Sequence, residues 1–249
     1  MHNTPAATVV QHLLFFCLLV VAPAWDYYDT SRLRKHPESG RKIRYYQTLA
    51  SWLWIASIVA YLVAGFRALF TIIPAPGDAA WLFGHAWVRY LVEAVIAVFM
   101  ALILLPPGIA IWKNLTKQPR KYSSADAMKS LSYFFPATWT ERRWFGFLCI
   151  TAAICEETLF RGFLLHYLHV VPWSLNLTLA LLLSSIIFGL QHLYQGAAGA
   201  ASSVIIGLLF GLLFLLTGNL LLPMLCHAVM DLRLLLLLRP PDSEITIAA

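Results

Sequence analysis

The chain has 249 residues, of which 60% are hydrophobic and only 12% are charged, and its mean hydropathy is +0.71. A soluble domain contains roughly 45–50% apolar and about 25% charged residues, so this composition excludes an ordinary soluble protein and indicates a polytopic membrane protein. The net charge of +6 does not indicate a nucleic-acid partner, because the lysines and arginines are concentrated in two segments between apolar stretches.

Apolar stretches long enough to cross a bilayer, which requires about 20 residues, recur along the chain. We therefore predict an all-α polytopic bundle of about seven transmembrane helices. Their expected ranges are 8–25, 48–73, 87–112, 143–168, 173–194, 200–217 and 220–238. Gly207 and Gly211 have the spacing of a helix-packing face in the sixth of these.

The basic residues predict which way the chain crosses the membrane. They cluster after the first and the third apolar stretch, whereas the segment after the second, PAPGDAAWLFGHAW, contains none. Because cytoplasmic loops carry an excess of lysine and arginine, we expect the N-terminus outside and the C-terminus in the cytoplasm. Within 113–142 we also expect an interfacial helix.

The stretch CEETLFRGF places three ionisable side chains, Glu156, Glu157 and Arg161, in the middle of the fourth expected span. An ionisable residue at membrane depth costs at least about 2.5–3.5 kcal/mol and is a functional candidate by default. Glu157 and Arg161 are separated by four residues with the acid first, which favours an ion pair. Glu156 points about 100° away from Glu157 and has no cation on its own helix, so it is suited to act as a general base.

Two later spans carry further polar groups. The fifth contains FGLQH, from Phe188 to His192, and the seventh contains HAVMD, from His227 to Asp231. His227 and Asp231 share a helix face, so Asp231 can orient the imidazole ring or, when protonated, donate a hydrogen bond itself. A glutamate and two histidines that converge from three helices could activate a water molecule and stabilise an oxyanion, as peptide-bond hydrolysis requires.

With these motifs the chain resembles the CAAX proteases and bacteriocin-processing enzymes, also called the Abi or type II CAAX prenyl endopeptidase family. That family has the pattern EExxxR, FxxxH and Hxxx(N/D) on successive helices, and this chain has EETLFR, FGLQH and HAVMD in that order. The resemblance implies a glutamate-dependent intramembrane endopeptidase whose catalytic core is formed by the last four helices, over 143–238. The remaining regions would be three helices with cytoplasmic basic loops, over 1–142, and a short cytoplasmic tail, over 239–249.

The resemblance also implies roles for individual residues. Glu156 would be the general base, His192 would help to hold the water, and His227 with Asp231 would form the oxyanion hole. Glu157, Arg161 and Phe188 would support the site. Members that act on prenylated proteins usually have asparagine at the position of Asp231, so the role of Asp231 and a prenylated substrate both stay open.

Several alternatives also stay open. A non-catalytic immunity or scaffold protein of the same family, or a proton-coupled transporter, would carry intramembrane acids as well. We expect no cofactor, although Glu156, His192 and His227 could form a zinc site. The expected partners are membrane lipid and a protein substrate that is lipidated or carries a C-terminal sorting tail. We expect a bacterial inner membrane as the location.

Overall fold

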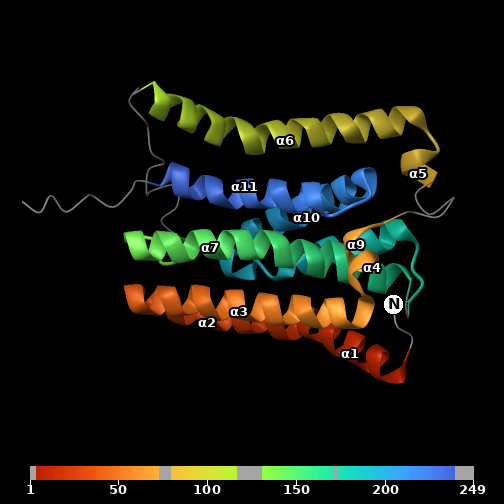
Figure 1. The fold of residues 1–249 in the computed structure, drawn as a ribbon, viewed down its shortest axis with the longest axis horizontal. Helices are drawn as coiled ribbons and strands as arrows, with labels where there is room; N and C mark the ends of the chain where they lie inside the picture. The colour runs from red at the N-terminus through yellow and green to blue at the C-terminus, as the bar shows by residue number, and fades with distance from the viewer. Residues whose placement is uncertain (1–3, 73–79, 117–130, 171–172, 239–249) are drawn as a thin grey trace, which may run out of the picture.

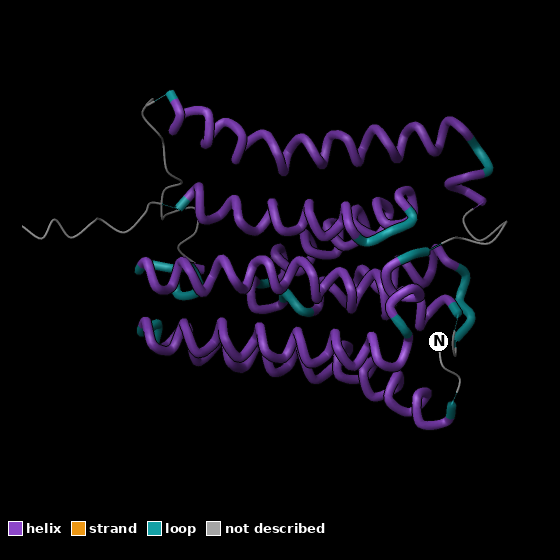
Figure 2. The backbone as a smooth tube through the Cα atoms, viewed as in Figure 1, coloured by secondary structure: helices purple, strands orange, loops and turns teal. Residues whose placement is uncertain are grey.

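The structure is a computed structural model, and it describes residues 4–72, 80–116, 131–170 and 173–238. These residues form a bundle of long helices whose axes lie approximately side by side (Figures 1 and 2). Four helices are long and apolar enough to cross a membrane, namely Pro5–Lys35, Ser39–Ala64, Ala86–Lys113 and Ala197–Thr217. The prediction of an all-α polytopic membrane protein is thereby confirmed. The expected tail at 239–249 lies outside the described residues.

The first span is one continuous helix built from α1 (Pro5–Phe16), a π-helical turn η1 (Cys17–Val21) and α2 (Ala22–Lys35). The Thr4 side chain caps its start by accepting a hydrogen bond from the N–H of Ala7. The prediction ended this helix at residue 25, but it continues for another ten residues, to Lys35. Basic side chains fill its last turn, where they complement the negative end of the helix dipole.

The second span, α3 (Ser39–Ala64), begins and ends earlier than the predicted range of 48–73. It stops at Gly65, whose φ of 81° is accessible to glycine but strained for other residues. A short helix, α4 (Phe66–Phe70), follows. Most of the first basic segment therefore belongs to the ends of α2 and α3 and not to a loop between them.

The third span is α6 (Ala86–Leu115), which follows the short α5 (Ala80–Phe83) and agrees with the predicted range of 87–112. The expected interfacial helix falls largely on residues 117–130, which lie outside the described residues. Residues 131–138 form a turn and not a helix of that kind. The ends of α2 and α6 and the starts of α3 and α7 lie at the same end of the bundle, on the left of Figure 1. The described basic residues of both segments are thus on one side, although which side this is stays a prediction.

The fourth predicted span, 143–168, is formed by α7 (Trp139–Glu156), a π-helical segment η3 (Glu157–Leu164) and α8 (Leu165–His169), which are not among the four long apolar helices above. Thr138 caps α7, and Lys42 Nζ lies 3.7 Å from the Glu141 carboxylate. Burial on its own would raise the pKa of Glu141, but hydrogen bonds from Ala137 and Ser39 together with the charge of Lys42 lower it.

The last three helices are α9 (Leu177–Leu190), α10 (Ala197–Thr217) and α11 (Leu221–Leu237). The predicted range of 173–194 was too long for α9, because Asn176 caps its start and a 3-10 turn, η4 (Leu193–Gln195), replaces its end. His192 therefore lies just beyond the helix, before Gly196 with its φ of 84°. The predicted packing role of Gly207 and Gly211 is confirmed: a Cβ on Gly211 would lie 2.3 Å from Leu181 on α9.

Candidate functional site

The predicted ion pair between Glu157 and Arg161 is present and buried. Arg161 Nη1 donates to Glu157 Oε1 over 3.0 Å, and the side chains are 3% and 0% exposed respectively. Arg161 also donates to the Gly207 carbonyl of α10 over 3.2 Å. Its guanidinium carbon lies 4.3 Å from the centre of the Phe188 ring and 5.6 Å from that of Phe210. One arginine thus connects η3 with α9 and α10.

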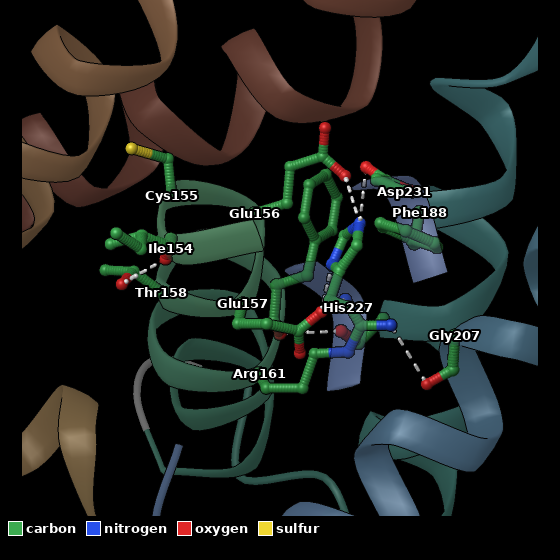
Figure 3. Close-up of polar contacts among 12 residues, drawn as sticks. Ile154, Cys155, Glu156, Glu157, Thr158, Arg161, Phe188, Gly207, His227 and Asp231 are labelled. Atoms are coloured by element: carbon green, nitrogen blue, oxygen red, sulfur yellow. Dashed lines mark hydrogen bonds and ion pairs between the residues drawn. The ribbon is translucent and has the colours of Figure 1, made fainter. Parts of the chain in front are cut away.

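His227 lies at the centre of the carboxylate cluster (Figure 3). Its Nδ1 is 2.8 Å from Glu157 Oε1 on one side of the ring. Its Nε2 is 3.5 Å from Asp231 Oδ2 and 3.9 Å from Glu156 Oε2 on the other. The predicted proximity of His227 and Asp231 is therefore confirmed. The contact to Glu157 was not predicted, because the sequence does not set the register between η3 and α11.

The contact to Glu157 determines how the His227 ring is held. Glu157 pairs with Arg161, and a carboxylate can only accept hydrogen bonds. The Nδ1 of His227 must therefore carry a proton, and Nε2 faces the two other carboxylates. The two adjacent glutamates hold opposite sides of one imidazole.

His192 is near this cluster but is not hydrogen-bonded to it. Its Nδ1 donates to the Phe188 carbonyl over 3.0 Å, and its ring centre is 4.9 Å from that of Phe188. The Phe188 ring also contacts the His227 ring edge-on, with ring centres 6.4 Å apart, so Phe188 lies against both histidines. In the described part of the chain no direct hydrogen bond joins His192 to Glu156, His227 or Asp231, so its expected role in holding water stays a prediction.

A cavity of about 330 Å³ opens on the two acids that face Nε2 of His227. The Glu156 side chain is 18% exposed and that of Asp231 is 28% exposed, whereas Glu157 is fully buried. The other lining residues are mainly aromatic and aliphatic: Leu49, Leu131, Phe134, Phe135, Phe145, Leu148, Cys149, Ala152, Tyr194, Gln195 and Leu234. The Glu156 and Asp231 carboxylates thus lie at the wall of an otherwise largely apolar cavity.

Several of these residues could not have been found from the sequence. Phe210 also stacks against the His227 ring, with centres 5.4 Å apart, but a single phenylalanine in an apolar helix carries no signal of its own. Tyr194 and Gln195 lie two and three residues after FGLQH, so proximity to that motif was the one available indication.

The candidate zinc ligands Glu156, His192 and His227 do not form a ligand cluster in the structure. Within the described ranges no group of three or more His, Cys, Asp or Glu side chains is arranged to hold a metal ion. Both ring nitrogens of His227 already face carboxylates, and Nδ1 of His192 is engaged by a carbonyl.

The fold and the site together define a polytopic helical membrane protein with carboxylates and an imidazole buried between its helices. Residues 138–233 match the family model described as "Type II CAAX prenyl endopeptidase Rce1-like". The matched residues include all three motifs, and the match confirms the resemblance to the CAAX protease family that those motifs indicate. No curated protein and no solved structure matches the chain.

Proposed function

We propose that the protein is an intramembrane endopeptidase in which Glu156 activates the attacking water. Membership of the C-terminal part in a protease family supports this activity at the level of the reaction class. The observation that carries the assignment to Glu156 is its position: its carboxylate reaches the 330 Å³ cavity and lies beside His227, whose other nitrogen is held by Glu157. A fixed imidazole next to an accessible carboxylate is suited to acid–base chemistry.

The proposed reaction begins when Glu156 takes a proton from water and the resulting hydroxide attacks the carbonyl carbon of the scissile peptide. The new C–O bond converts the carbonyl oxygen to an oxyanion. The C–N bond then breaks, and the proton held by Glu156 passes to the leaving amine. The products are a free carboxyl group and a free amine, and no other reactant is consumed.

We propose that His227 stabilises the oxyanion as an imidazolium. Three carboxylates surround its ring, those of Glu156, Glu157 and Asp231, and Arg161 supplies the one guanidinium in contact with Glu157. This charge balance favours a ring that is protonated on both nitrogens. Nε2–H would then be the donor that faces the cavity side, and Asp231 would orient it or, when protonated, donate a second hydrogen bond.

We further propose that no metal takes part. In the described residues the His, Cys, Asp and Glu side chains form no group of three or more that is arranged to hold a metal ion, which supports this part of the proposal. We therefore expect activity to survive a strong chelator. Loss of activity that zinc alone restores would overturn this part of the proposal.

The cavity supports a substrate with an apolar segment next to the cleaved bond. Its wall of phenylalanine and leucine side chains can accommodate lipid-like or apolar groups, while the two acids lie where the peptide would be cut. We propose a membrane-associated protein that is lipidated or carries a C-terminal sorting tail, cleaved within an integral membrane enzyme. Neither nucleic acid nor a soluble cofactor is required.

The test compares protein termini in membranes from cells that contain the natural protein, Glu156→Gln or Glu38→Gln at equal abundance. Glu38 is an exposed glutamate at the start of α3 without a side-chain capping hydrogen bond, so it is a matched control. We expect new N- and C-termini with the natural protein and the control, and none with Glu156→Gln. Identical termini in all three would reject the peptidase and favour the scaffold.

A further inference from the structure

A second cavity, of about 430 Å³, lies between α2 and α3 and is separate from the carboxylate cluster. We call it the basic cavity, and it is lined by Trp25, Asp29, Arg32, Leu33, Arg41, Arg44, Tyr45 and Thr48. It lies at the bundle end where α2 stops and α3 starts, on the left of Figure 1. The proposed peptidase chemistry uses none of these residues.

Helical spacing explains why these side chains meet. Residues 25, 29, 32 and 33 recur at intervals of four, three and one, which puts them on one face of α2. Residues 41, 44, 45 and 48 recur at three, one and three, which puts them on one face of α3. The two faces are brought opposite each other by the short connection over 36–38.

The charge of the basic cavity is unbalanced. Three arginines and one aspartate line it, which leaves an excess of two positive charges. None of the ion pairs among the described residues uses Arg32, Arg41 or Arg44, and Arg32 instead lies over the Tyr28 ring at 5.6 Å. Guanidinium groups bind phosphate oxygens through paired hydrogen bonds, so the cavity is suited to an anionic phosphate.

The surroundings indicate that this phosphate belongs to a lipid. The indole of Trp25 and the ring of Tyr45 are stacked with centres 6.5 Å apart at the cavity wall. Tyr27 and Tyr28 are 59% and 58% exposed at the same level of α2. Tyrosine and tryptophan gather where a membrane protein crosses from hydrocarbon to water, and basic pockets between helices at that level bind lipid head groups.

We propose that the basic cavity binds the phosphate head group of an anionic phospholipid. Tyr45 also lies edge-on to Phe134, with ring centres 5.8 Å apart, and Phe134 lines the carboxylate cavity. One aromatic contact therefore separates the bound lipid from the wall of the proposed active site. The inference itself does not depend on the peptidase activity, because its readout is lipid binding.

The test titrates delipidated full-length protein in neutral detergent with phosphatidylglycerol, phosphatidylcholine or inorganic phosphate. Binding is followed by native mass spectrometry and by the thermal unfolding midpoint. The natural protein is compared with Arg41→Gln/Arg44→Gln and with Lys113→Gln/Arg143→Gln. The second pair removes the same charge near the end of α6 and the start of α7, two helix ends that lie at the same end of the bundle, and neither residue lines the cavity.

We expect phosphatidylglycerol to bind more tightly than the other two ligands. Arg41→Gln/Arg44→Gln should weaken the binding of phosphatidylglycerol about 30-fold. This fold-change corresponds to about 2 kcal/mol at 1.4 kcal/mol per tenfold change, which is about 1 kcal/mol for each cation removed. The control pair should change it less than threefold. Arg32→Gln should weaken it about fivefold, and it provides the comparison on α2 if the double variant fails to fold.

Equal weakening by the two double variants would reject the cavity as the binding site and leave only a general effect of surface charge. If phosphatidylcholine binds as tightly as phosphatidylglycerol, the proposed selectivity for an anionic lipid is rejected. An equal response to inorganic phosphate would reject the lipid as the source of the phosphate.

Discussion

Glu157→Gln and Glu156→Gln each remove one negative charge from adjacent positions, but we expect only Glu157→Gln to lower the stability of the fold strongly. Glu157 is fully buried, pairs with Arg161 at 3.0 Å and accepts from His227 at 2.8 Å. Breaking a buried ion pair on one side typically costs about 3–5 kcal/mol, because the other charge is left uncompensated. Arg161 keeps its contacts with the Gly207 carbonyl and the Phe188 ring in this variant. We therefore expect Glu157→Gln to lower the unfolding free energy by about 3 kcal/mol, the lower end of that range.

Glu156→Gln should change that free energy by less than about 1 kcal/mol. The Glu156 side chain is partly exposed to the cavity and its recorded ionic contact, to His227, is as long as 3.9 Å. Removing its charge also relieves repulsion from neighbouring carboxylates. We expect this variant to fold normally and to lose peptide cleavage.

The unfolding free energy of each purified variant is measured in bicelles by steric trapping. Peptide cleavage is measured in the same preparations. Adding Arg161→Met to Glu157→Gln should restore part of the lost stability, because it removes the uncompensated charge. A Glu157→Gln protein within 1 kcal/mol of the natural one, or equal destabilisation by Glu156→Gln, would refute the assignment of a structural and a chemical glutamate.

Three further predictions concern single positions. Asp231→Asn keeps a hydrogen-bonding side chain of the same size, so we expect its cleavage rate to stay within about tenfold of the natural rate. Asp231→Ala should lower that rate by about 10²–10³. Equal inactivity of the two variants would contradict this expectation. Gly189→Ala would place a Cβ 2.8 Å from the Ala200 carbonyl oxygen. We expect this variant to lose about 1–3 kcal/mol of unfolding free energy in the same assay, and an unchanged unfolding free energy would contradict the close packing of α9 on α10. The pKa of Glu141 is lowered in the folded protein, so its stabilisation is present above its ordinary pKa of about 4.3 and is lost as the pH falls through the folded value. The difference in unfolding free energy between the natural protein and Glu141→Gln should therefore stay constant from pH 7 to about pH 5 and shrink as the pH falls below about 4.3. A difference that stays constant below that pH as well would show that Glu141 is not the titrating group.

Composition and hydrophobic periodicity were sufficient to predict the all-α membrane fold, because a chain that crosses lipid must satisfy its backbone hydrogen bonds within each helix. Helix ends were predicted less well where local chemistry decided them. Gly65 stops α3 nine residues before the predicted end, at 64 and not 73, and basic residues assigned to a loop belong to helix ends. A hydropathy pattern does not detect a left-handed glycine or a basic side chain that reaches from a helix to the interface.

Spacing within one helix likewise predicted the pairs Glu157–Arg161 and His227–Asp231, since residues four apart lie on the same helix face. Only the tertiary structure brought Glu157 to Nδ1 of His227, Phe210 to its ring and the basic cavity to the α2–α3 pair. The register and rotation between helices depend on side-chain packing over the whole bundle, and no spacing along a single segment contains that information. The sequence alone therefore identified the candidate groups, and the packing of the helices decided which of them face one another.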